Sequence, residues 1–184
     1  MTKTNNKQIN TTAYWETMYF TEFPIAQERV INERFDRIMQ ILNPYKDADS
    51  ILDVGCGWGE FLKKLSEAGF KGEKWGVDIV PELLYKASRR FPGFNFVMRD
   101  AEDLPFEKDS FDIVFCGETL EHLNDPHSVI KKLKQIAKKV LVVTVPFERM
   151  IEAPEHMHYF SLEDFKQYKP FILEKQGSNI ICAI

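Results

Sequence analysis

Glycine recurs at every second position in one short segment of this 184-residue chain. Residues 51–59 read Ile-Leu-Asp-Val-Gly-Cys-Gly-Trp-Gly, an apolar run that ends in an acid and passes into the glycines. The run is typical of a buried strand. Because glycine has no Cβ, Gly55, Gly57 and Gly59 let the backbone turn sharply and let a ligand approach it closely. The pattern predicts a nucleotide-type binding loop.

The spacing of these glycines narrows the choice of nucleotide. The dinucleotide fingerprint is G-x-G-x-x-G, whose third glycine allows the following helix to pack closely. In this chain the third glycine comes one residue early, and Glu60 takes its place, where a carboxylate would repel a pyrophosphate. Gly-Lys-Ser/Thr does not follow, so a P-loop would lack its lysine. A dehydrogenase is therefore the weaker alternative within this fold class.

Residues 52–59 resemble motif I of the class I S-adenosylmethionine (SAM)-dependent methyltransferases, and residues 100–114 match a pattern common in the small-molecule branch, the "methyltransferase type 11" domains. The resemblance covers roughly residues 25–184. It implies an α/β fold with a doubly wound, mostly parallel seven-stranded sheet and a C-terminal antiparallel hairpin, a Rossmann-like methyltransferase fold. It also implies methyl transfer from SAM to an O, N or C atom of a small molecule, with S-adenosylhomocysteine (SAH) as the other product.

Acids at the ends of the next two predicted strands complete the expected cofactor site. Asp78 follows the glycine loop by about twenty residues, where an acid can accept hydrogen bonds from a ribose diol. Alone, such an acid would indicate only a solvated strand end. In the resembled family this position binds the ribose, Asp100-Ala101 contact the adenine, and Asp53 lies near the methionine part. The expected SAM-binding set is Asp53, Gly55, Cys56, Gly57, Trp58, Gly59, Asp78, Ile79, Asp100, Ala101, Glu102, Gly117 and Glu118.

A group of acids and a histidine follows the fourth predicted strand. Glu118, Glu121 and His122 are spaced i, i+3 and i+4, so a helical turn over residues 117–123 would place them on one face. His122, with Glu118 beside it, is the candidate catalytic residue, since imidazole can take a proton from an acceptor hydroxyl. The alternative is a structural histidine bonded to a backbone carbonyl. Methyl transfer to a well-positioned acceptor needs no dedicated nucleophile.

The same group could hold a divalent metal, although we favour a site without one. Carboxylates and imidazoles are ligands for magnesium and related ions, and His156 or His158 could complete the shell. The alternative metal set is Glu118, Glu121, His122 and His156. Glu-x-x-Glu-His resembles the metal-binding motif of small-RNA 2′-O-methyltransferases, which gives a second hypothesis of metal-assisted methylation of an RNA end. A third hypothesis is a non-catalytic SAM-binding module that serves a partner.

Two aromatic segments are available to recognise the methyl acceptor. Residues 146–160 form a long loop after a strand's carboxyl end, and either contact the substrate or cover the core. Residues 1–24 form an N-terminal extension whose aromatic side chains either close over the reactants as a lid or pack on the sheet. The expected acceptor-binding residues are Tyr14, Trp15, Tyr19, His156, His158 and Tyr159.

Alternating strands and helices are expected to position these residues. The strands are predicted at 50–54, 74–78, 95–98, 111–116 and 140–145, with a closing hairpin at 171–174 and 180–184. The helices are predicted at 25–42, 59–68, 81–90, 125–138 and from 161. Such alternation favours a mostly parallel sheet with helices on both faces and ligands outside the carboxyl ends of the strands. Asp112 is expected to fix a strand start and to carry no chemistry.

The composition indicates which broad class of protein this chain belongs to. With 44% hydrophobic and 28% charged residues, a chain of this length can form one compact domain. The net charge of −4 argues against a broad nucleic-acid surface. Cys56, Cys116 and Cys182 are few and widely spaced, as expected of reduced thiols in a cytoplasmic protein. The sequence contains no apolar membrane span, and its first ten residues do not resemble a signal peptide. We expect a cytoplasmic monomer or homodimer.

Overall fold

A single seven-stranded sheet forms the centre of the computed structural model, which describes residues 11–21, 28–148 and 153–184, with the backbone alone for 19–21 and 28–33. The strand order is β3-β2-β1-β4-β5-β7-β6. The first five strands are parallel, and β7 runs antiparallel to both β5 and β6. The strands are β1 Ser50–Val54, β2 Glu73–Asp78, β3 Asn95–Met98, β4 Phe111–Gly117, β5 Ala137–Pro146, β6 Ile172–Gln176 and β7 Asn179–Ala183. The predicted sheet with its closing hairpin is confirmed.

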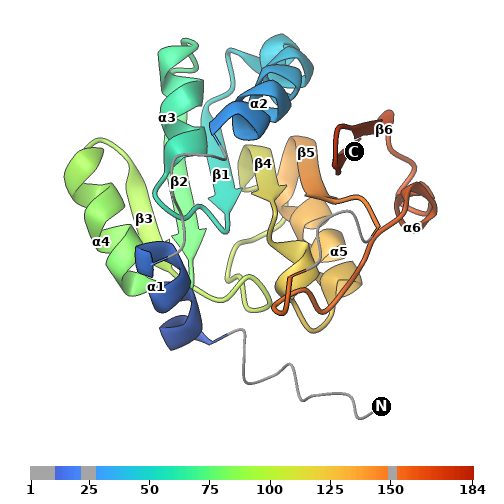
Figure 1. Cartoon of the computed structure of the whole chain (residues 1–184). Coiled ribbons are helices and arrows are strands. Elements are labelled where there is room, and N and C mark those ends of the chain that lie inside the picture. Colours follow the sequence, from blue (N-terminus) through green and yellow to red (C-terminus); the bar gives the residue numbers. More distant parts are fainter. Residues whose placement is uncertain (1–10, 22–27, 149–152) are drawn as a thin grey trace.

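Helices cover both faces of this sheet (Figure 1). They are α1 Thr12–Thr21, α2 Glu28–Leu42, α3 Glu60–Glu67, α4 Pro81–Arg90, α5 Pro126–Ile136 and α6 Leu162–Lys166, with short 3₁₀ helices η3 Asn43–Tyr45 and η4 Leu120–His122. Residues 25–27 of the helix predicted at 25–42 lie outside the described residues. Among the residues that the structure describes, no helix combines the length and the apolar character that a membrane crossing requires.

Two hydrophobic clusters lie on opposite faces of the sheet. Successive side chains of a strand point to opposite faces, so Ile51 packs with α2 and α3, whereas Leu52 and Val54 pack with α5. In β4, Ile113 and Phe115 face α2 and α3, whereas Val114 and Cys116 face α5. The central strands are therefore buried on both faces, as their continuous apolar runs predict.

The carboxyl ends of the parallel strands meet at one edge of the sheet, where α1 also lies (Figure 1). The strand order reverses at this edge between β1 and β4, because the chain moves from β1 outward to β2 and β3 and then returns to the other side. In open α/β sheets, ligands bind in the crevice at such a switch point. The loops after β1, β2, β3 and β4 all reach it.

Asp112 holds the opposite, amino-terminal end of β4. Its carboxylate accepts a hydrogen bond from the backbone N–H of Asp49 at 2.7 Å and one from Lys139 at 2.8 Å. Burial acts to raise the pKa of Asp112, but Lys139 and the Asp49 N–H together lower it below its usual value. The expectation that Asp112 fixes a strand start is confirmed. Lys139 belongs to β5, so the helix predicted to reach residue 138 ends earlier, at Ile136.

Candidate cofactor and acceptor site

The glycine loop after β1 folds back over the end of β2. Gly55, Gly57 and Gly59 have φ angles of +76°, +50° and +77°, a region that side chains other than glycine rarely adopt. The backbone N–H groups of Gly55 and Cys56 both donate to the carbonyl of Val77, at 2.8 and 3.0 Å. A Cβ on Gly55 would lie 2.0 Å from Thr119 Oγ1. The loop thus brings bare backbone to the switch point.

Asp78 fixes this loop from the end of β2. Its carboxylate accepts hydrogen bonds from the N–H groups of Gly57 at 2.8 Å and Val80 at 3.0 Å, one on each oxygen. Burial raises the pKa of Asp78, and these donors oppose the rise. Each carboxylate oxygen has a second lone pair, so the group can also accept from a ribose hydroxyl.

A cavity of about 250 Å³ opens beside Asp78, lined by Thr12, Ile79, Met98, Arg99 and Asp100. Complete ligand pockets are usually about 300–1,000 Å³, so this cavity fits part of a cofactor rather than the whole. Asp100 Oδ1 accepts the N–H of Glu102 at 2.9 Å, which fixes the turn after β3.

Glu102 faces away from this cavity toward the start of α5. Its carboxylate accepts from Asn124 Nδ2 at 2.7 Å and from the Asp125 N–H at 2.9 Å. Glu102, predicted to bind cofactor, thus ties two loops together. Trp58 lies half-buried in the glycine loop with Lys86 Nζ 5.4 Å from its ring centre.

Two predicted cofactor residues are buried beneath the loop. Asp53 is 2% exposed, and burial, with a further contribution from Asp78, raises its pKa well above the usual value. Burial also raises the pKa of the Cys56 thiol, which disfavours the nucleophilic thiolate form. A cationic group of the cofactor would favour the charged form of Asp53.

Glu118 does not lie on a common helical face with Glu121 and His122, contrary to the predicted turn over residues 117–123. The 3₁₀ helix η4 begins only at Leu120, and Glu118 has a φ of +50°. Three residues hold its carboxylate: Arg34 at 3.1 Å, Asn179 at 2.8 Å and Thr144 at 3.1 Å. Thr144, a polar residue inside an apolar strand, is the one sequence signal that could have indicated this contact.

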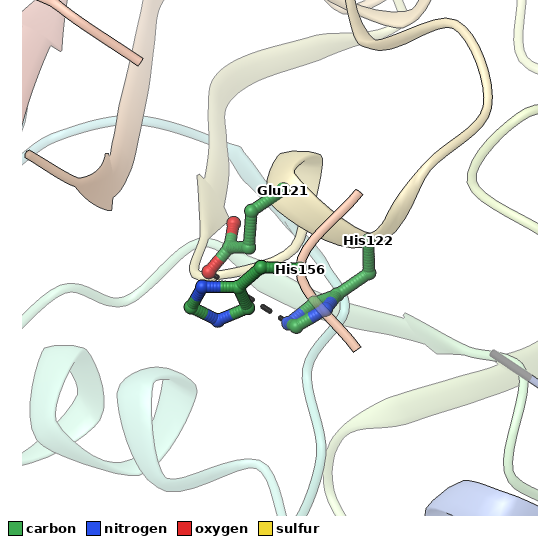
Figure 2. A group of neighbouring side chains, drawn as sticks. All are labelled: Glu121, His122 and His156. Carbon is green, nitrogen blue, oxygen red and sulfur yellow. Dashed lines mark ion pairs between the residues drawn. The ribbon is translucent and has the colours of Figure 1, made fainter. Parts of the chain in front are cut away.

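Glu121, His122 and His156 come together from two segments, as Figure 2 shows. Glu121 is 1% exposed. The His122 Nδ1 atom lies 3.2 Å from the backbone oxygen of Glu155, and its Nε2 atom lies 3.7 Å from Glu121 Oε1. Burial, chiefly, lowers the pKa of His122 to about 4, so this ring is neutral at pH 7. The contact with a backbone carbonyl is the arrangement expected of the structural alternative.

The N-terminal helix α1 lies against this cluster. Tyr14 donates its hydroxyl to Glu155 Oε2 at 3.0 Å, and the Trp15 ring packs edge-on against His122 with ring centres 4.6 Å apart. His156 is buried beside them, and Tyr159 is exposed. His158 donates its N–H to the Glu121 carbonyl at 3.2 Å. The side chain of Tyr19, also predicted to contact the acceptor, lies outside the described residues.

The glycine loop at the switch point and the reversed C-terminal hairpin define the Rossmann-like methyltransferase fold. Residues 52–141 match the model of a methyltransferase domain family. The structure is similar to magnesium protoporphyrin IX methyltransferase from Synechocystis PCC 6803 with bound SAH, with a TM-score of 0.70 and 17% identity over 97% of this chain and 96% of that one.

Two curated methyltransferases are similar to this chain in sequence. Malonyl-[acyl-carrier protein] O-methyltransferase from a Marinomonas species is 29% identical over 85% of this chain and 72% of its own length. Demethylmenaquinone methyltransferase from Bacillus velezensis is 32% identical over 56% of this chain and 46% of its own. The chain spans about half the length of several curated relatives that it matches. The matched domain, the fold and these relatives together support a class I SAM-dependent methyltransferase.

Proposed function

We propose that this protein binds SAM and transfers its methyl group to an O, N or C atom of a small molecule, releasing SAH. The observation that carries the proposal is the hydrogen bond from Gly57 to Asp78, which closes the glycine loop over β2 beside the cavity at Ile79 and Asp100. This arrangement suits a nucleoside whose ribose lies on Asp78 and whose adenine lies in the cavity.

The methionine part of the cofactor would lie toward Asp53, Gly117 and Glu118. Methyl transfer from a sulfonium is an in-line displacement, in which the C–S bond breaks as the bond to the acceptor forms. Holding donor and acceptor in that line supplies much of the rate. Glu118 is already fixed by Arg34 and two other residues, so its carboxylate is rigid beside the sulfonium position. These cofactor assignments are proposals.

We expect His122 to position the methyl acceptor and not to act as the base that deprotonates it. Its pKa of about 4 makes it a weak base at neutral pH. It touches Trp15 of α1, so it joins the loop after β4 to the N-terminal extension that would cover the acceptor. Tyr14, His156 and Tyr159 surround the same region and are the further candidates for acceptor contact.

The experiment is an assay for SAH formation with SAM and a panel of acceptors. Demethylmenaquinone, malonyl-[acyl-carrier protein] and magnesium protoporphyrin IX, the acceptors in the names of similar proteins, give the panel its first members. SAH formation above the acceptor-free rate, lost in Asp78→Asn, would support the proposal. Saturable SAM binding without turnover on any acceptor would favour the non-catalytic module, and turnover on a short RNA alone would favour the RNA hypothesis.

A further inference from the structure

We propose that Glu121, His122 and His156 bind a divalent transition-metal ion of the zinc type, at a site beside the proposed SAM site and within the proposed acceptor region. One ligand atom from each residue lies within 4.8 Å of the other two, and the side chains point toward one another (Figure 2). Two imidazole nitrogens and one carboxylate oxygen form a donor set that suits zinc and its neighbours better than magnesium.

The Glu121 carboxylate is the first reason for a cation here. The residue is 1% exposed, and its Oε2 atom is buried without a hydrogen-bond partner among the described residues. A buried carboxylate oxygen with no donor is costly, and a metal ion removes that cost.

The orientation of His122 is the second reason. Its Nδ1 atom lies 3.2 Å from the Glu155 carbonyl oxygen, which can only accept, so Nδ1 carries the proton. The Nε2 lone pair is then directed at Glu121 Oε1, 3.7 Å away. The two acceptor atoms, Nε2 of His122 and Oε1 of Glu121, are thus too far apart for a hydrogen bond. A cation bound to both atoms would stabilise them in this arrangement. A backbone carbonyl on the second nitrogen is the usual way in which proteins orient a metal-binding histidine.

The two segments that carry the ligands are already joined by backbone hydrogen bonds. The N–H groups of Met157 and His158 both donate to the carbonyl of Glu121, at 2.8 and 3.2 Å. The two residues that follow His156 therefore stay beside η4. Zinc–ligand bonds of ~2.0–2.2 Å place tetrahedral ligand atoms about 3.4 Å apart, so closing the site from separations within 4.8 Å needs a contraction of at most about 1.4 Å.

Glu118 is not part of this site, because Arg34, Thr144 and Asn179 hold its carboxylate. The metal set therefore differs from the sequence alternative by the loss of one acid. Three protein ligands leave a fourth position for water or for an oxygen of a bound molecule. The site lies directly beneath Trp15, so a bound ion would tie the loop after β4, the segment after β5 and α1 together.

The test is titration of Zn²⁺, with Mn²⁺ and Mg²⁺ for comparison, into the chelator-treated full chain, followed by calorimetry and by the melting temperature. We expect one saturable Zn²⁺ site, a melting temperature raised by several degrees at saturating metal, and weaker or absent Mg²⁺ binding. His156→Ala should lose at least about tenfold in Zn²⁺ affinity. His127→Gln, whose ring contacts Tyr168 outside the cluster, should bind zinc as the unchanged protein does.

Glu121→Gln separates the metal site from a merely structural cluster. Without metal this variant should melt at the same temperature or higher, because it removes a buried carboxyl group whose Oε2 atom has no hydrogen-bond partner among the described residues, yet the rise caused by zinc should be lost. No saturable zinc binding by the unchanged chain, or a zinc affinity that is unaltered in both His156→Ala and Glu121→Gln, would overturn the proposal. SAH binding measured on the same samples tests the SAM site separately, so either proposal can fail alone.

Discussion

Gly55 has no space for a side chain. A Cβ there would meet Thr119 Oγ1 at 2.0 Å, and the φ of +76° is unfavourable for any other residue. Thr119 Oγ1 in turn donates to the carbonyls of Val54, at 3.3 Å, and Gly117, at 3.1 Å. The turns after β1 and β4 are therefore packed together at this point, and neither can move without the other.

Gly55→Ala should lower the free energy of unfolding by about 2–4 kcal/mol, through backbone strain and the clash with Thr119. Chemical denaturation monitored by circular dichroism measures the change. Gly93→Ala is the matched control, because a Cβ at Gly93 has no atom within 4 Å, and its effect should stay below about 1 kcal/mol. Equal stabilities of the two variants would show that the contact is unimportant.

Asp78→Asn should weaken SAH binding by at least about tenfold. Both oxygens of Asp78 accept backbone N–H groups, and an amide offers only one acceptor oxygen, so either Gly57 or Val80 loses its bond. The affinity is measured by calorimetry at matched protein concentration. Asp112→Asn, which changes an acid at the far end of the sheet, should leave the SAH affinity unchanged; an equal loss in both variants would point to general destabilisation instead.

At the scale of elements, the local sequence patterns predicted correctly those strand bounds and helix starts that depend on neighbouring residues. β1 and β3 have the predicted bounds, and Pro81 and Pro126 begin helices where proline is expected. The errors come from contacts between residues far apart in sequence. The helix predicted to reach residue 138 ends at Ile136, and Lys139 lies in β5 and pairs with Asp112 from β4.

Within the site, sequence indicated the glycine loop and Asp78 but not the environment of Glu118. Its spacing with Glu121 favoured a shared helical face, whereas Arg34 from α2 and Asn179 from β7 hold the side chain elsewhere. Neither partner is near in sequence, so a pattern of neighbours could not reveal them. The meeting of His156 with η4 likewise depends on backbone hydrogen bonds across the fold.

Asp112→Asn should cost about 1–2 kcal/mol of unfolding free energy at pH 7, through loss of the charged bond to Lys139. The pKa of Asp112 is lowered in the folded state, so its stabilisation is complete above the unfolded pKa of about 3.9 and is lost as pH falls through the folded value. Urea unfolding from pH 3 to pH 7 should therefore show a constant difference above about pH 5 that shrinks in acid. A difference that persists undiminished at pH 3, or none at pH 7, would contradict this account.

At the scale of the whole molecule, α1 touches the site without joining the core. None of its described side chains is buried, yet Thr12 lines the cavity and Tyr14 and Trp15 contact the segment after β5 and the turn after β4. The helix thus lies along this edge of the sheet between the cavity and the turn after β4. This placement fits the prediction of an N-terminal lid, which remains a prediction.

Removal of residues 1–24 should leave a cooperatively folding domain whose melting temperature changes by no more than about 3 °C, because little buried area is lost. The dissociation constant for SAH should rise by at least about threefold, as one cavity wall is removed. Scanning calorimetry and titration measure the two quantities. Tyr14→Phe, which removes only the hydroxyl contact to Glu155, is the milder comparison; a truncated chain that does not fold would place α1 in the core instead.

The central claim is that the glycine loop and Asp78 form a SAM site, and calorimetric titration of the full chain with SAH and, separately, with NAD tests it most directly. We predict one saturable SAH site per chain with a dissociation constant of about 1–100 µM and no saturable binding of NAD. Absence of saturable SAH binding, or tighter binding of NAD than of SAH, would contradict the claim.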